Sequence, residues 1–161
     1  MGKETSAIDL LRENSRPDTQ KRRQIAALAA LGLVDFSIIS LYQLGYIRHL
    51  PDPPGKLFDS DQVNASEEAV ILGMPDGVIS LGAYAAIMFL ATAGSAQKTR
   101  SRWLDWLLGG IIAGQAIGAA QYLYKMVAVE KKVCLYCVTG AIINFVSVKP
   151  ALELLTEGKQ L

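Results

Sequence analysis

The two cysteines of the chain, Cys134 and Cys137, form a single Cys-X-X-Cys motif. The motif lies where the polar residues 130–132 give way to an apolar run. At the start of a helix, two cysteines with this spacing can form a disulfide, and the positive end of the helix dipole favours a thiolate. The motif therefore indicates reversible thiol–disulfide chemistry. The alternative interpretation is that both cysteines are small buried apolar residues.

Other chemistries are disfavoured by the composition of the chain. A zinc site needs further soft ligands, and the sequence offers only His49, far upstream, which we interpret as a solvated loop residue. We therefore expect no metal. The net charge of +1 gives no basis for nucleic-acid binding.

Four apolar runs are available to position the motif. The first carries one charge, Asp35, and the others carry none; they cover residues 24–47, 77–97, 106–124 and 133–148. About 20 apolar residues cross a bilayer as a helix, whereas soluble helices usually carry a charged face. The sequence thus predicts an all-α fold, an integral membrane four-helix transmembrane bundle over residues 24–156. Its expected spans are 24–47, 77–97, 103–125 and 133–155, with an outer loop at 48–76 and a cytoplasmic polar tail at 1–23.

Basic residues are distributed unequally between the two sides of this bundle. Eleven fall on the side of the termini, at positions 3, 12, 16, 21, 22, 23, 98, 100, 102, 149 and 159, against five on the other side, at 48, 56, 125, 131 and 132. The positive-inside rule then places both termini in the cytoplasm and the motif near the outer face. Disulfides persist on that side of a membrane.

Polar residues and glycines within the spans suggest close packing between helices. Asp35, Gln115 and Asn144 fall at similar depths, so they are expected either to hydrogen-bond to one another or to form a proton route. Glycines at 110, 114 and 118 form a smooth stripe for another helix, which is either part of the bundle or a second copy.

The outer loop carries two expected helix starts. Ser66 is expected to cap a helix at its N-terminus, and Asp76, at the outer boundary of the second span, is expected to cap the next one. The acids at 59, 61, 67 and 68 either attract a basic partner or keep the loop solvated.

With these parts in order, the chain resembles the vitamin K epoxide reductase family of quinone-linked thiol oxidoreductases. The resemblance covers about residues 24–155. It rests on the motif with the Val138, Thr139 and Asn144 that follow it, on the loop pattern at residues 63–66, and on residues 72–75 leading to Tyr84.

This resemblance implies a four-helix bundle around a quinone such as menaquinone or ubiquinone. Cys137 would face the quinone and Cys134 would exchange with an incoming thiol. The implied quinone site also includes Ser66, Asp76, Tyr84 and Ala141. Asp76 stands where the family has an amide, and Ala141 stands where it usually has an aromatic residue.

The sequence departs from the family in its outer loop. The second cysteine pair of the family would fall near Asp52 and on Ser60, so this chain is a variant without the loop shuttle cysteines. Electrons would then reach Cys134 directly from an external dithiol, such as a thioredoxin-like protein.

Three functions follow from these observations. The first is a membrane thiol–disulfide oxidoreductase that passes electrons from an external dithiol through Cys134 and Cys137 to a membrane quinone. The second is a non-catalytic member of the fold that binds quinone or lipid and keeps a structural disulfide. The third is a membrane scaffold that pairs through the glycine stripe.

Overall fold

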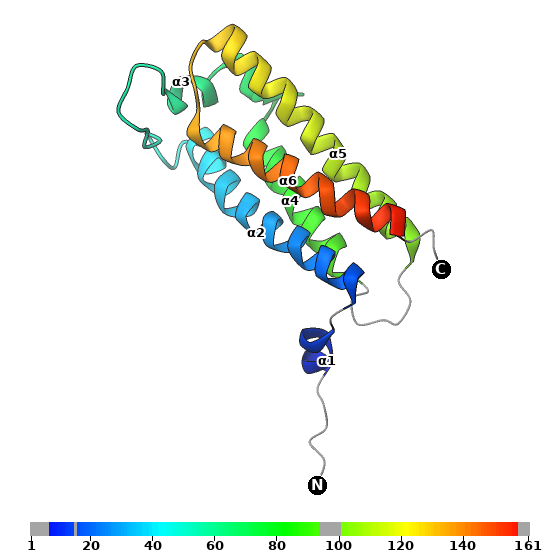
Figure 1. Ribbon diagram of the computed structural model, residues 1–161. Coiled ribbons are helices and arrows are strands. Elements are labelled where there is room, and N and C mark those ends of the chain that lie inside the picture. The colour runs from blue at the N-terminus through cyan, green and yellow to red at the C-terminus, as the bar shows by residue number, and fades with distance from the viewer. Residues whose placement is uncertain (1–6, 15, 94–100, 158–161) are drawn as a thin grey trace.

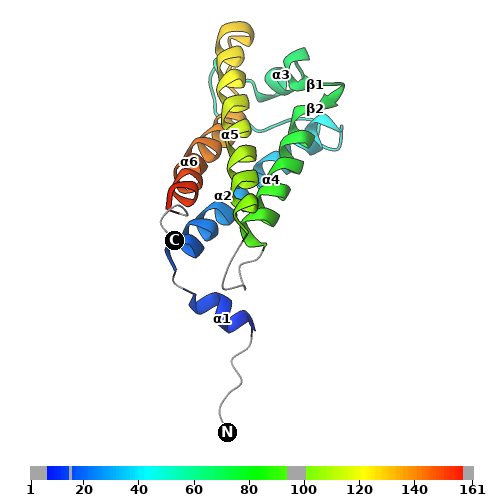
Figure 2. The same cartoon turned by 90° about the vertical axis from the view of Figure 1, so that its right-hand side faces the viewer.

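The computed structural model describes residues 7–14, 16–93 and 101–157. A short helix, α1 (Ala7–Glu13), precedes four long helices that lie side by side: α2 (Pro17–Gln43), α4 (Asp76–Thr92), α5 (Arg102–Lys125) and α6 (Leu135–Glu157) (Figure 1). Helix α2 packs against α4 and α6, and α5 packs against α6 and α4. The start of α2 and the end of α6 lie at one end of the bundle, and the loop elements lie at the other (Figures 1 and 2).

Three helices among the described residues are long and apolar enough to cross a membrane. They are α2, α5 together with its extension to Glu130, and α6 as far as Thr156. Helix α4 is apolar but has 17 residues, which at 1.5 Å per residue gives about 25 Å, at the short limit for a span. The predicted all-α membrane bundle is confirmed, and the crossing of the membrane by α4 stays a prediction.

The observed helices differ from the expected spans mainly at their ends. Helix α2 begins at Pro17, so residues 17–23 are helical although we expected them in a polar tail; proline suits the first position of a helix. The helix ends at Gln43 rather than near residue 47. Helix α6 continues through Pro150, as expected for a membrane helix whose neighbours compensate for the lost hydrogen bond. The end of the second expected span and the basic turn after it fall on residues 94–100, outside the described residues.

Short elements of the outer loop cover the end of the bundle that carries the Cys-X-X-Cys motif. They are α3 (Ser60–Asn64), the 3-10 turn η1 (Glu67–Ala69) and a hairpin of β1 (Val70–Ile71) and β2 (Met74–Pro75). Ser66 occupies the expected N-cap position, before η1, but its hydroxyl donates to the Val63 carbonyl at 2.8 Å and makes no cap bond. The loop helix starts earlier, where the Asp59 carboxylate accepts a hydrogen bond from the Gln62 N–H.

The outer loop is hydrogen-bonded to the segment that leads into α6. After α5, a π-helical turn, η2 (Met126–Glu130), ends at Lys131, whose φ of 54° turns the chain back. The Val133 N–H then donates to the Leu57 carbonyl at 2.9 Å, and the Asp59 N–H donates to the Val133 carbonyl at 3.2 Å. These bonds hold the loop beside the motif.

Candidate functional site

The Cys-X-X-Cys motif forms the start of α6, as the sequence predicted. Cys134 directly precedes the helix, and its Sγ accepts a hydrogen bond from the Cys137 N–H at 3.1 Å. This is the position and the bond of an N-cap, with sulfur as the acceptor. A negative sulfur there is stabilised both by the bond and by the helix dipole. Both cysteines are free thiols.

Asn64 of α3 lies against both sulfurs and was missed in the sequence analysis. Its Nδ2 donates to Cys134 Sγ at 3.1 Å, and Cys137 Sγ donates to its Oδ1 at 3.8 Å. Asn64 is 3% exposed and Cys134 is fully buried. The only sequence signal was the loop pattern at residues 63–66, which does not show that Asn64 faces a motif 70 residues away.

Hydrogen bonds to Cys134 favour its ionised form. The Cys137 side chain, followed by the Cys137 backbone N–H, the Ser60 hydroxyl and the Asn64 amide, lowers the pKa of Cys134 to about 7, although burial acts in the opposite direction. An ordinary cysteine titrates near 8.5. Cys134 is therefore the cysteine suited to be a thiolate near neutral pH.

This assignment predicts a particular pH dependence of the thiolate. In the fully reduced protein, the ultraviolet absorbance of the thiolate should rise as the pH increases through about 7, and the Cys134→Ser variant should lack that rise. A midpoint near the ordinary value of about 8.5 would contradict it.

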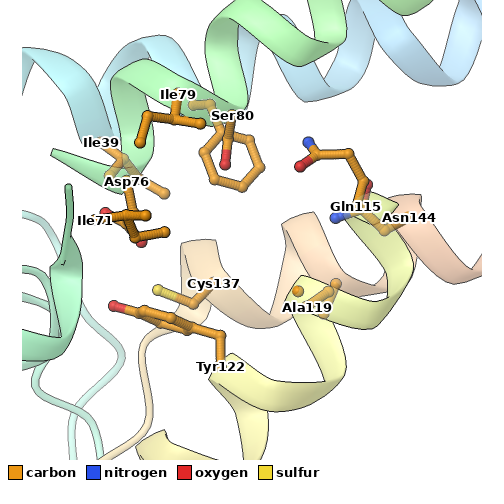
Figure 3. A pocket seen from close by; sticks show the side chains of 13 residues that line it. Ile39, Ile71, Asp76, Ile79, Ser80, Gln115, Ala119, Tyr122, Cys137 and Asn144 are labelled. Carbon is orange, nitrogen blue, oxygen red and sulfur yellow. The ribbon is translucent and has the colours of Figure 1, made fainter. Parts of the chain in front are cut away.

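A cavity of about 120 Å³ lies between α2, α4, α5 and α6, directly beside Cys137. Figure 3 shows Asp76 and Ile71 on one side of it, Gln115 and Asn144 on the opposite side, and Cys137 with Tyr122 along a third side. The rest of its wall is mostly apolar and consists of Phe36, Ile39, Ile79, Ala119 and Ala141 together with Ser80 and Gly118. Cys134 does not line this cavity, so the two sulfurs have different surroundings.

The structure brings together only part of the quinone site that the resemblance implied. Asp76 and Ala141 line the cavity. Tyr84 is buried beside it, with its hydroxyl donating to Asn144 Oδ1 at 2.8 Å, and does not line it. Ser66 lies farther out, along a separate surface groove.

Gln43 at the end of α2 holds Asp76 in place. Its Nε2 donates to Asp76 Oδ1 at 2.6 Å, and its Oε1 accepts from the Gly77 N–H at 3.1 Å. Asp76 is the first residue of α4 rather than the residue before it, so the expected N-cap role is wrong. The Gln43 side chain instead accepts a hydrogen bond from the Gly77 N–H, which has no partner within α4. No sequence pattern predicted this role.

The three polar residues expected at one depth do not form a mutual network. Asn144 pairs with Tyr84, whereas Asp35 Oδ2 and Gln115 Nε2 are buried without a hydrogen-bond partner among the described residues. Gln115 lines the cavity, and Asp35 does not. A buried amide N–H without an acceptor is costly, so Gln115 offers the cavity an available donor.

His49 and the acids of the outer loop are mostly paired with one another or with nearby lysines. His49 contacts the Asp61 carboxylate, which raises the pKa of the imidazole above its ordinary value. Glu68 contacts Lys125, and Asp59 lies 3.9 Å from Lys132 Nζ. Among the described residues, no three His, Cys, Asp or Glu side chains gather into a metal site.

Comparison with known protein families agrees with this geometry. The sequence profile of the vitamin K epoxide reductase family matches residues 23–150. Members of this family are in general membrane thiol oxidoreductases that use a quinone and work with thioredoxin-like proteins. The apolar helices and this match make the protein a multi-pass membrane protein. The chain belongs to the vitamin K epoxide reductase family.

Proposed function

We propose that this protein passes two electrons from an external dithiol protein, through Cys134 and then Cys137, to a quinone held in the cavity. The observation that carries the proposal is the different placement of the two sulfurs. Cys137 lines the cavity between the spans, whereas Cys134 lies outside it, under the outer loop. This difference supports the assignment of Cys137 to the quinone and of Cys134 to the partner.

The residues of the cavity suit the ring of a quinone. Its wall is mostly apolar, and an apolar cavity of roughly 150 Å³ is known to hold benzene, so about 120 Å³ is close to the space of a single ring. The unpaired Gln115 N–H is available to a carbonyl oxygen on one side, and Asp76 lies on the other. Tyr122 adds an aromatic wall from α5, although Ala141 supplies none. A bound quinone would supply the two-electron acceptor.

The chemistry at Cys134 follows from thiol–disulfide exchange. A thiolate of the partner attacks Cys134 Sγ in the oxidised motif, and Cys137 leaves with the electron pair of the broken bond. The second partner thiolate then attacks the partner's own sulfur, and Cys134 leaves as a thiolate. The partner becomes a disulfide and the motif becomes a dithiol. Asn64 and the N–H of Cys137 stabilise the leaving sulfur of Cys134.

The proposed orientation places the motif near the outer face and both termini in the cytoplasm. Its support is the excess of basic residues on the side of the termini. The partner then docks over the outer loop. Because most acids of this loop are paired within the chain, charge attraction adds little to that docking.

One observation favours the alternative of a non-catalytic member of the fold. Cys134 is fully buried beneath the outer loop, so a partner reaches it only when that loop moves. If the loop never opens, the cysteines can only form a structural disulfide. Reduction of the motif by a dithiol and its oxidation by a quinone separate the two functions.

The test is to count free thiols before and after adding a quinone to the reduced protein in isolated membranes without oxygen. We expect both Cys134 and Cys137 to become resistant to alkylation soon after quinone is added, because both electrons come from this pair. Denaturing the samples before alkylation removes any effect of burial. Thiols that stay free, or a disulfide that no dithiol reduces, would contradict the proposal and favour the non-catalytic function.

A further inference from the structure

The carboxylate of Asp52 clamps the first residue of the loop helix α3. Its Oδ1 accepts a hydrogen bond from the Ser60 hydroxyl and its Oδ2 accepts one from the Ser60 N–H, both at 2.6 Å. Ser60 is fully buried, and its Oγ also accepts a hydrogen bond from the Leu135 N–H at 3.3 Å. The two oxygens of one carboxylate therefore fix both the backbone and the side chain of Ser60.

Ser60 in turn holds the amide that contacts the motif. The Ser60 carbonyl accepts a hydrogen bond from Asn64 Nδ2 at 2.8 Å, and the same nitrogen donates to Cys134 Sγ at 3.1 Å. The two hydrogens of this amide are thus shared between Ser60 and Cys134. Fixing the Ser60 carbonyl fixes the rotation of the amide and hence the direction of its second N–H.

We propose that Asp52 is a positioning residue for Cys134: acting through Ser60 and Asn64, it aims the amide N–H that stabilises the Cys134 thiolate. This inference rests on the proposed function, in which Cys134 leaves as a thiolate when the partner disulfide forms. Asp52 bonds to Ser60 and makes no hydrogen bond to the sulfur among the described residues. It supplies the rigidity that a donor needs in order to stabilise a charge as it develops.

Asp52 and Ser60 are also the positions that the family resemblance assigned to a second cysteine pair. In this chain the same two positions are joined by hydrogen bonds instead of by sulfur chemistry. The pair cannot relay electrons. It does keep α3 against the start of α6, which is the contact that the stabilisation of Cys134 requires.

The test is the pH midpoint of the Cys134 thiolate, read from ultraviolet absorbance in the reduced full-length protein. In Asn64→Leu we expect the midpoint to rise by about one pH unit, because a hydrogen bond to an ionised group is lost. In Asp52→Asn, an N–H₂ group replaces one acceptor oxygen and the clamp is broken. Loss of the Asp52 charge favours the thiolate and offsets part of this effect, so we expect a net rise of about half a unit. The titratable side chains that face Cys134, which are Cys137 and Tyr136 of α6 and Tyr122 of α5, are unchanged in both variants.

The double variant separates a positioning role from a general loosening of the loop. If Asp52 acts through Asn64, adding Asp52→Asn to Asn64→Leu should raise the midpoint no further than Asn64→Leu alone does. An additive shift in the double variant, or no shift in Asp52→Asn, would overturn the inference. Ser60→Ala removes half of the clamp but also removes a hydroxyl that stabilises the Cys134 thiolate directly, so it should raise the midpoint by more than Asp52→Asn does. Asp52→Glu keeps the charge and displaces the clamp, and should raise the midpoint even if Asp52→Asn does not fold.

The matched control is Glu67→Gln, which neutralises an exposed acid in the same loop and should leave the midpoint unchanged. The readout needs neither quinone nor partner. If the proposed function is wrong, quinone will not oxidise the two cysteines, but the midpoint of the Cys134 thiolate will still shift in the variants. Failure of this inference would appear as unshifted midpoints in a protein that quinone still oxidises.

Discussion

Replacing Cys137 by serine should abolish thiol-dependent reduction of quinone and at the same time trap the partner protein on Cys134. This variant forms no internal disulfide, so the mixed disulfide forms in the reverse direction: the Cys134 thiolate attacks the disulfide of an oxidised partner, and one partner sulfur leaves as a thiolate. In the native chain Cys137, the nearest thiol, would then attack Cys134 and release the partner, and serine cannot. The trapped species should run as a heavier band on a non-reducing gel and disappear when a reductant is added. Mass spectrometry of that band would identify the partner.

Cys134→Ser provides the matched control, because it also removes activity but should trap nothing. The rate of quinone reduction is expected to fall to the background rate in both variants, since a single thiol cannot form the internal disulfide. A mixed disulfide on Cys137 in the Cys134→Ser variant would show that the roles of the two sulfurs are reversed. Undiminished activity in either variant would show that the motif takes no part in the reaction.

Replacing Gly32 by alanine should strongly destabilise the bundle. A Cβ atom at Gly32 would lie 2.3 to 2.5 Å from three ring atoms of Tyr84, well inside van der Waals contact. Tyr84 is 1% exposed, packs against Phe36, and is held by its hydrogen bond to Asn144, so its ring has little room to move. Forcing extra volume into such a core costs about 1–3 kcal/mol, and breaking the Tyr84–Asn144 bond adds to this.

The measurement is reversible unfolding of the purified protein in detergent. Gly82→Ala is the matched control, since a Cβ at that position on α4 meets no atom within 4 Å. We expect Gly82→Ala to unfold like the native protein and Gly32→Ala to unfold at a clearly lower denaturant concentration. Equal stability of the two variants would show that Tyr84 does not pack on Gly32 in the membrane protein.

The glycine stripe on α5 illustrates a pattern whose meaning depended on the structure. Cβ atoms added at Gly110, Gly114 or Gly118 would meet no atom within 4 Å, so within the described part of the chain no helix uses the stripe for close packing. The glycines that do allow close approach are Gly32, Gly77, Gly109 and Gly140. Small residues at helical spacing thus predicted close packing but not where it occurs.

The sequence by itself determined the properties that depend on neighbours along the chain. Long runs of apolar residues must become helices in a membrane, because no other regular element satisfies the backbone of a single segment there. The two-residue spacing of Cys134 and Cys137 at the start of such a run placed both sulfurs on the first turn of α6. These local constraints were enough for the bundle, the redox motif and the family.

Only the tertiary structure decided which side chains surround the motif. Asn64 and Asp52 lie in a loop that a sequence pattern does not orient, and Gln43 acts on Asp76 and Gly77 across more than 30 positions. Ser66 and Tyr84 were placed in the quinone site by analogy, yet Ser66 lines a separate surface groove and Tyr84 packs on Gly32 beside the cavity. A hydrogen bond between distant residues depends on the packing of whole helices, and single-residue preferences do not contain that information.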